Sequence, residues 1–130
     1  MTQYKIKKYS DFYFNDINKL NELEGWDNLV DHKNDFKKAL ENSITYVVLD
    51  NDDNFLGYVR ALTDGFITLF ICELLINKRK RSLGLGSMLI NFLHERYPKT
   101  RIDLLATENS SKFYKHKNFR LFYGYRKSFE

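Results

Sequence analysis

The fold is decided by residues 70–93, which read FICELLINKRKRSLGLGSMLINFL. The first part, Phe70–Asn77, is almost entirely apolar, which is typical of a strand that is buried on both faces. The last part carries an apolar stripe at the spacing of one α-helix face, formed by Leu85, Met88, Leu89, Phe92 and Leu93. Residues 70–93 therefore predict a strand, a cationic loop and a helix in succession.

Two glycines mark the point where the predicted strand gives way to the helix. At Gly84 and Gly86, backbone N–H groups can approach a ligand in conformations that a Cβ would forbid. The start of a helix adds unpaired N–H donors and the positive end of the helix dipole. Four consecutive cations, Lys78–Arg81, precede the glycines. Together these features predict a pocket for a phosphate or pyrophosphate group.

Three glycine patterns that bind phosphate can be compared with this loop. The spacing G-x-x-x-x-G-K-S/T of the P-loop is absent. The dinucleotide fingerprint G-x-G-x-x-G would need glycine at Leu89, although Asp103 lies near the distance of its acidic residue. The pattern R/Q-x-x-G-x-G/A is satisfied by residues 81–86, which read RSLGLG. This loop resembles the acetyl-coenzyme A loop of the GNAT superfamily of N-acetyltransferases.

Two flanking segments extend the resemblance, which runs from about Ile44 to Phe119. Leu74–Ile76 stands where the family's fourth strand binds the pantetheine arm of the cofactor. Downstream, residues 112–119 read KFYKHKNF and resemble the family's x-F-Y-x-x-x-G-F segment. Asn118 replaces the usual glycine, and asparagine tolerates left-handed backbone better than most residues do.

Composition places the chain among globular domains. Its 130 residues predict one domain, spanning 1–130, and its 43% hydrophobic and 29% charged residues are typical of a soluble protein. No apolar run approaches the roughly 18 residues of a membrane span, and the first residues lack the core of a signal peptide. The single cysteine excludes an internal disulfide and fits a reducing compartment. We therefore expect a cytoplasmic protein without a membrane partner.

Local patterns predict the element order β-α-α-β-β-β-α-β-α-β. Alternating, β-branched and apolar runs predict strands at 4–9, 44–49, 55–62, 66–77, 102–106 and 119–129. Helical spacing predicts helices at 14–24, at 29–42 with Asp27 as N-cap, after the glycine loop, and at 110–117. The strands between 44 and 77 should form an antiparallel meander. For a GNAT domain, the resemblance implies this order and an α/β fold with a central mixed sheet flanked by helices.

The resemblance also implies a cofactor site for acetyl-coenzyme A. No metal is expected, because His32, His94 and His116 share no metal-ligand spacing. Main-chain N–H groups of the loop would bind the pyrophosphate, and those of the strand before it the pantetheine, one of them reaching the thioester oxygen. The residues are Leu74, Leu75, Ile76, Arg81, Ser82, Leu83, Gly84, Leu85 and Gly86. In the family a bulge in this strand opens the slot for the cofactor arm.

Two side chains are candidate catalytic groups. Tyr114 matches the family's tyrosine, which contacts the cofactor and protonates the departing thiolate, although its usual pKa of about 10 exceeds the thiol's of about 8.5. Glu73 is the only charge within the apolar strand. Burial would raise its pKa toward that of a general base, or it pairs structurally with Arg60 on the neighbouring strand. Cys72 is typical of a small core residue, whereas Trp26 either lines the acceptor site or packs in the core.

The function implied is transfer of an acetyl group from acetyl-coenzyme A directly to an amine of a small molecule. A protein or peptide amine is an alternative acceptor, and a module that binds acyl-coenzyme A without catalysis is an alternative of another class. A nucleic-acid binder built on Lys78–Arg81 is disfavoured, because an aromatic RNA-recognition motif and a second basic stripe are absent. GNAT domains frequently dimerise, so a homodimer is a further expectation.

Overall fold

Five strands form one sheet, in a computed structural model that describes residues 3–128, and the three middle strands are rich in β-branched and aromatic residues. The strands lie across the sheet in chain order: β1 (Lys5–Lys8), β2 (Ile44–Leu49), β3 (Phe55–Thr63), β4 (Thr68–Ile76) and β5 (Arg101–Leu104). Neighbours are antiparallel from β1 to β4, whereas β5 runs parallel to β4. The sheet is therefore mixed, and the predicted meander between residues 44 and 77 is confirmed.

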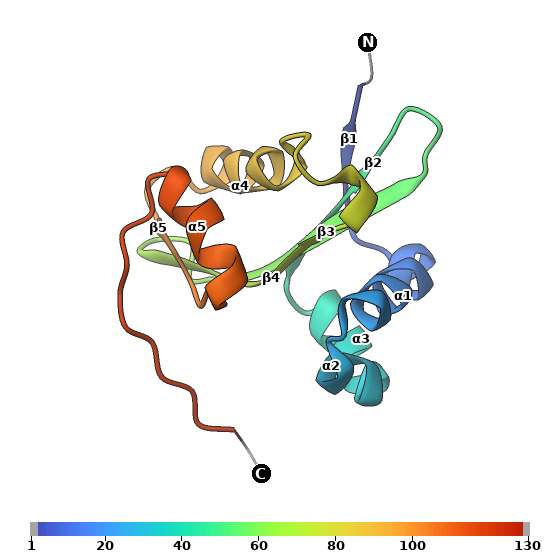
Figure 1. Ribbon diagram of the computed structural model, residues 1–130, viewed down its shortest axis with the longest axis horizontal. Helices are drawn as coiled ribbons and strands as arrows, with labels where there is room; N and C mark the ends of the chain where they lie inside the picture. Colours follow the sequence, from blue (N-terminus) through green and yellow to red (C-terminus); the bar gives the residue numbers. More distant parts are fainter. Residues whose placement is uncertain (1–2, 129–130) are drawn as a thin grey trace.

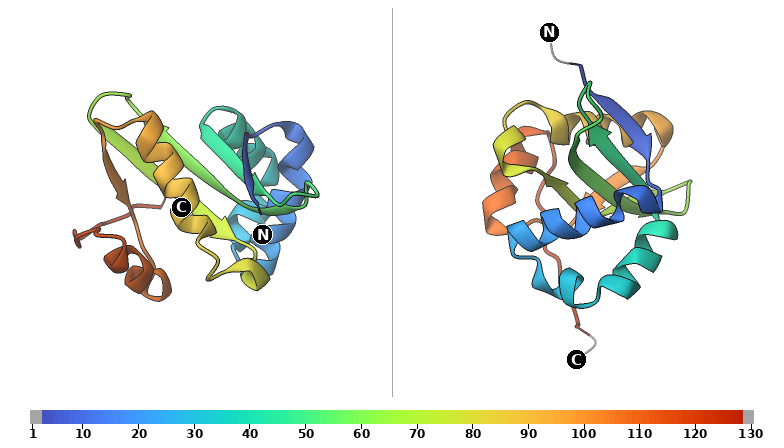
Figure 2. Two further views of the ribbon diagram at one scale, coloured as in Figure 1. Left: turned by 90° about the horizontal axis from the view of Figure 1, so that it is seen from above. Right: turned by 90° about the vertical axis from the view of Figure 1, so that its right-hand side faces the viewer.

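Helices cover both faces of this sheet (Figures 1 and 2). One face carries α1 (Phe14–Glu24), α2 (Asp27–Asp31) and α3 (Lys33–Glu41), and the other carries α4 (Leu85–Arg96). The last helix, α5 (Glu108–His116), follows β5, and short 3-10 turns precede α1 (Asp11–Tyr13) and α4 (Lys78–Lys80). None of the helices within residues 3–128 is both long enough and apolar enough to cross a membrane.

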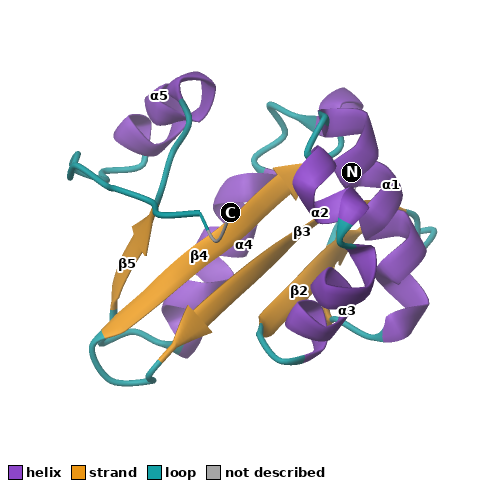
Figure 3. Ribbon diagram, turned by 90° about the horizontal axis from the view of Figure 1, so that it is seen from below, coloured by secondary structure: helices purple, strands orange, loops and turns teal. Residues whose placement is uncertain are grey.

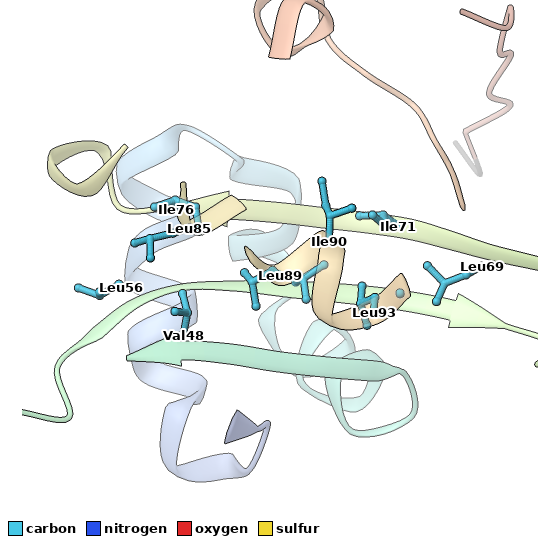
Figure 4. Packing of buried hydrophobic residues seen from close by; sticks show 11 residues of the cluster. Val48, Leu56, Leu69, Ile71, Ile76, Leu85, Leu89, Ile90 and Leu93 are labelled. Carbon is cyan, nitrogen blue, oxygen red and sulfur yellow. The ribbon is translucent and has the colours of Figure 1, made fainter. Parts of the chain in front are cut away.

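Two apolar cores, one on each face, hold the helices to the sheet. The predicted stripe of α4 supplies Leu85, Leu89 and Leu93, which are at most 1% exposed. Figure 4 shows these side chains meeting residues of the central strands, among them Val48 and Ile71. The second core joins α1 and α3 to the opposite face of the sheet. Because α4 is fixed along its whole apolar stripe, the loop that precedes it has a defined end point.

Most predicted elements are present with similar bounds. The helix at 14–24 and the strand at 44–49 have the predicted residues, and the ends of β1, β3, β4, β5 and α5 differ by at most two residues. The predicted α/β class, with a mixed sheet flanked by helices, is confirmed.

Two predicted elements are wrong. The helix expected over 29–42 is two helices, which break at His32, where φ is −109° and ψ is 40°. Weak helix formers such as Val30 and Asp31 precede this break, and Asp27 is the first residue of α2 rather than an N-cap. The strand expected over 119–129 is absent in residues 119–128, because no neighbouring strand pairs with their backbone, and residue 129 lies outside the described residues.

Candidate functional site

A bulge divides β4 into a half that is paired on both sides and a half that is paired on one. β3 pairs with β4 on either side of Cys72 but skips Cys72 itself, which is the extra residue of the bulge. β5 pairs with β4 only over Thr68–Ile71, and Figure 3 shows the two strands diverging beyond this point. Residues 72–76 therefore lack a strand partner on the side facing away from β3. We call this side of residues 72–76 the open side of β4.

The chain turns from β4 into α4 through a loop with left-handed backbone. The Asn77 side chain accepts a hydrogen bond from the backbone N–H of Arg79 at 3.0 Å and so starts the turn. Ser82 and Gly84 then have φ values of 71° and 81°. Gly84 is the N-cap of α4 and has no side chain that could satisfy the first N–H groups of the helix. The local sequence thus leaves the start of α4 uncapped.

Unpaired backbone donors gather at this uncapped start. Within the described residues, the N–H groups of residues 82–87 donate to no protein acceptor. The N–H groups of Leu85, Gly86 and Ser87 lie in the first turn of α4. N–H groups there have no partner within the helix and form the positive end of the helix dipole. The hydroxyl of Ser87 is buried and also lacks a partner. The unpaired N–H groups fit an anionic ligand, which would accept hydrogen bonds from them.

The side chain of Arg81 is bound to its own protein rather than free for a ligand. Its Nε donates to the backbone carbonyl of Ile76 at 3.0 Å, and its Nη2 donates to the Glu24 carboxylate at 2.6 Å. The guanidinium therefore ties the loop to the end of β4 and to α1. A contact of this loop with an anion would therefore come mainly from the backbone, with the exposed Lys78–Lys80 adding positive charge nearby.

Helix α5 places Tyr114 in the same neighbourhood. Its ring packs edge-on against Phe113 and Phe119, with ring centroids 5.1 and 5.4 Å away. Its hydroxyl has no hydrogen-bond partner among the described residues. Burial raises the pKa of Tyr114 to about 12. The phenol therefore stays protonated at neutral pH and can donate a hydrogen bond, but it is a weaker acid than a free tyrosine.

Gly86 allows α5 to approach the loop. A Cβ on Gly86 would lie 3.2 Å from Cζ of Phe113 and 3.8 Å from Cδ2 of Leu74. Residues from the loop, α5 and the open side of β4 thus meet around this glycine. The sequence prediction missed both Phe113 and Ser87. Phe113 could have been found because it stands next to Tyr114 in the segment that resembles the family, and Ser87 because it lies in the first turn of the predicted helix.

Glu73 forms an ion pair with Arg60, which is one of the two roles that the sequence predicted for it. Arg60 Nε and Nη2 donate to the two Glu73 oxygens at 2.5 and 2.7 Å, and the two side chains are only 15% and 11% exposed. Arg60 also donates to the Ser43 hydroxyl at 3.2 Å and lies over the ring of Phe36. Burial by itself lowers the pKa of Arg60, but the hydrogen bonds and charge of Glu73 outweigh it and raise that pKa. The structural pairing is confirmed, and the role of Glu73 as a base stays a prediction.

Two further side chains have clear positions. Cys72 is half-buried, and this burial raises the pKa of its thiol. Trp26 packs against the core between the sheet and α1–α3. Both observations agree with packing roles.

Comparison with known proteins identifies the family. The profile of the acetyltransferase (GNAT) domain family matches residues 15–128. The chain belongs to this family. Among curated proteins, none matches the sequence significantly. The predicted membership of the GNAT superfamily is thereby confirmed.

Solved structures show the same fold. A GNAT family acetyltransferase from Streptococcus pneumoniae aligns with a TM-score of 0.71 and 24% identity, over 93% of this chain and 89% of that protein. An acetyltransferase from Trypanosoma brucei aligns with a TM-score of 0.68 and 18% identity, over 97% of this chain and 99% of that protein. At these identities the alignments show that the fold is shared.

The buried ion pair predicts strong coupling between Arg60 and Glu73. Arg60→Met leaves the Glu73 carboxylate buried without a partner, so the free energy of unfolding should fall by about 3–5 kcal/mol. In the variant that combines Arg60→Met with Glu73→Gln, the loss should be smaller than the sum of the two single losses by about 2 kcal/mol. Urea denaturation of the four proteins measures this difference. Additive losses would contradict the coupling.

Proposed function

We propose that the chain is an acetyl-coenzyme A-dependent N-acetyltransferase that moves the acetyl group directly to an amine of a small molecule. The observation that carries the proposal is the run of unpaired N–H groups at residues 82–87, next to the open side of β4. We propose that residues 1–130 form one such domain. A cytoplasmic location is proposed from the single cysteine, which fits a reducing compartment.

Backbone donors from two elements would bind the cofactor. The N–H groups of the loop and of the first turn of α4 suit the pyrophosphate, and the open side of β4 suits the amide groups of pantetheine. The proposed contacts are Leu74, Leu75, Ile76, Arg81, Ser82, Leu83, Gly84, Leu85, Gly86 and Tyr114. Acetyl-coenzyme A supplies a thioester that an amine can attack. Groups of this chain would carry out every other step of the acetyl transfer, without a metal ion.

Tyr114 and Glu73 are the proposed catalytic residues. The hydroxyl of Tyr114, which has no partner among the described residues, would donate a hydrogen bond to the sulfur as negative charge develops there, and would serve as the proton donor of the departing thiolate. Glu73 would accept a proton from the acceptor amine, directly or through water. The proton would then pass on to solvent. The raised pKa of Cys72 supports direct transfer, since an acetylated thiol intermediate requires a reactive thiolate.

A panel of acceptors separates this function from its alternatives. Thiol release from acetyl-coenzyme A would be followed with a disulfide reagent in the presence of small primary amines, lysine peptides and peptides with free N-termini. Release stimulated by small amines supports the proposal, and release stimulated only by peptides assigns a protein acceptor. Cofactor binding without release for any amine would indicate a module that binds acyl-coenzyme A without catalysis. DNA binding that weakens steeply with salt would instead favour the nucleic-acid alternative.

A branched side chain at Gly86 should block the cofactor site. Gly86→Val fills the space between the loop, Phe113 and Leu74, so we expect affinity for acetyl-coenzyme A to fall at least about tenfold, a loss of about 1.4 kcal/mol. Titration calorimetry measures the affinity, and circular dichroism checks the fold. Leu23→Val is the matched control, because this exposed residue of α1 is not among the proposed cofactor contacts. An unchanged affinity in folded Gly86→Val would refute the site.

Loss of the Tyr114 hydroxyl should slow turnover without weakening cofactor binding. We expect Tyr114→Phe to lower kcat about 100-fold, with KM for acetyl-coenzyme A within about twofold. Tyr97→Phe, which removes a hydroxyl at the end of α4, is the control. Since Tyr114 stays protonated up to about pH 12, the wild-type rate should rise with pH as the acceptor amine loses its proton, with no decline below about pH 11. Equal turnover in Tyr114→Phe would remove this role.

A further inference from the structure

The last turn of α1 is fixed firmly to the sheet. Asn21 is fully buried, and its side-chain oxygen accepts a hydrogen bond from the Tyr58 hydroxyl of β3 at 2.7 Å. Gly25 ends the helix in left-handed backbone, with φ of 81°, and the Trp26 N–H donates to the Asn21 carbonyl at 2.9 Å. Glu24, the last residue of α1, lies in sequence between these two anchors. Its backbone therefore has a defined position, from which its carboxylate can hold another part of the chain.

Residues 81–84, which we call the glycine loop, have few bonds of their own. Ser82, Leu83 and Gly84 are exposed, and Ser82 has a φ of 71°, which is left-handed backbone that favours glycine. Within residues 3–128, the only side chain of this loop that forms a hydrogen bond or ion pair is that of Arg81. Exposed backbone with few bonds has low local stability. The order of the glycine loop therefore depends largely on how Arg81 is held.

Two groups from different elements hold Arg81. Its Nη2 donates to the Glu24 carboxylate at 2.6 Å, and its Nε donates to the Ile76 carbonyl at 3.0 Å. Bonds from two nitrogens of a planar guanidinium fix its orientation, whereas a single bond leaves it free to turn. The side chains of Arg81 and Glu24 are 39% and 31% exposed, so water screens the pair only in part. Arg81 thus connects the end of α1 to the end of β4, directly before the unpaired N–H groups of residues 82–87.

We propose that Glu24 is a positioning residue for the cofactor: through Arg81, it holds the N–H groups that follow in the orientation that binds the pyrophosphate. The inference rests on the proposed function and extends the site to α1, which supplies none of the proposed cofactor contacts. Donors that are ordered beforehand reduce the entropic cost of binding. The loss of Glu24 should therefore weaken the binding of the cofactor and leave the rate of the bound complex unchanged.

The negative charge of Glu24 gives this role a distinctive sign. A carboxylate near an anion site repels the anion, so Coulomb forces alone predict that removal of Glu24 strengthens cofactor binding. An Arg81 side chain released from Glu24 would add to that gain, because it could turn toward a phosphate. Positioning predicts the opposite result, since the glycine loop would lose its anchor. The direction of the change in affinity therefore separates positioning from a surface ion pair that has no role in binding.

Titration calorimetry with acetyl-coenzyme A measures this direction. We expect Glu24→Ala to weaken binding about fivefold, the upper range for a part-exposed ion pair. Glu24→Gln keeps an oxygen at the same reach and should recover part of the loss. In steady-state kinetics, KM for acetyl-coenzyme A should rise with the dissociation constant, while kcat stays within about twofold. Unchanged or tighter binding in Glu24→Ala would overturn the proposal.

Two further variants test whether the effect is specific. Glu22→Ala is the matched control, because it removes the same charge from α1 and its exposed side chain forms no hydrogen bond or ion pair within the described residues. Its affinity for acetyl-coenzyme A should equal or slightly exceed that of the wild type. Because Glu24 acts through Arg81, Glu24→Ala should cause no further loss in an Arg81→Met background. Equal weakening in Glu22→Ala, or additive losses at Glu24 and Arg81, would contradict the positioning role.

A measurement without cofactor separates failure of this inference from failure of the proposed function. NMR relaxation of the free protein reports the backbone order of residues 82–84, whose order parameters should fall from about 0.85 toward 0.6 in Glu24→Ala. They should stay at the wild-type values in Glu22→Ala. A glycine loop that remains ordered in Glu24→Ala would overturn the inference. If the wild type binds no acetyl-coenzyme A, the proposed function fails, whereas loss of order in Glu24→Ala alone would still support the positioning of the loop by Glu24.

Discussion

The backbone constraint on which this structure depends is the bulge at Cys72. An extra residue in β4 shifts its register with β3, and pairing with β5 stops directly before it. Backbone groups in the middle of a sheet normally satisfy one another, and a bulge is the usual way to leave some of them open without breaking the strand. The open side of β4 lies in a strand that remains held on its other side by β3. A ligand at this position would therefore meet donors and acceptors that are fixed before it binds.

The loop and the start of α4 likewise hold unpaired backbone groups in fixed positions. Gly84 cannot cap α4 with a side chain, so the first turn keeps its N–H groups unpaired, while the apolar stripe of the helix is buried against the sheet. The helix is thus held firmly at a place where its N-terminus is chemically unsatisfied. Arg81 adds rigidity by joining the loop to β4 and α1. Preorganised donors of this kind bind an anion without first having to be ordered, which reduces the entropic cost of binding.

Charged and polar groups around β4 divide into structural and free ones. Arg60 and Glu73 satisfy each other in a poorly exposed position, and Ser43 and Phe36 complete their surroundings. Tyr114, by contrast, has a packed ring and a hydroxyl without a partner among residues 3–128. Its ring fixes the position of the hydroxyl, and burial keeps the proton on it. Under the proposed function, the cofactor would complete groups that have no partner among residues 3–128, such as the loop amides and the Tyr114 hydroxyl.

The sequence alone determined the elements with strong local periodicity. The helix at 14–24, the strand at 44–49 and the glycine loop between an apolar strand and an apolar helix stripe could all be predicted, because each depends on spacing within a few turns or residues. The loop was also specific enough to indicate the GNAT family, since its glycines and cation stand at a fixed spacing.

Only the tertiary structure decided features that depend on distant partners. The bulge at Cys72 depends on the registers of β3 and β5, and the pairing of Glu73 depends on Arg60, which lies 13 residues away in sequence. The strand composition of residues 119–128 predicted a strand that is absent, because a strand requires a neighbouring backbone and the path of the chain leads away from one. Local sequence sets what a segment can become, whereas pairing across the sheet decides whether it does.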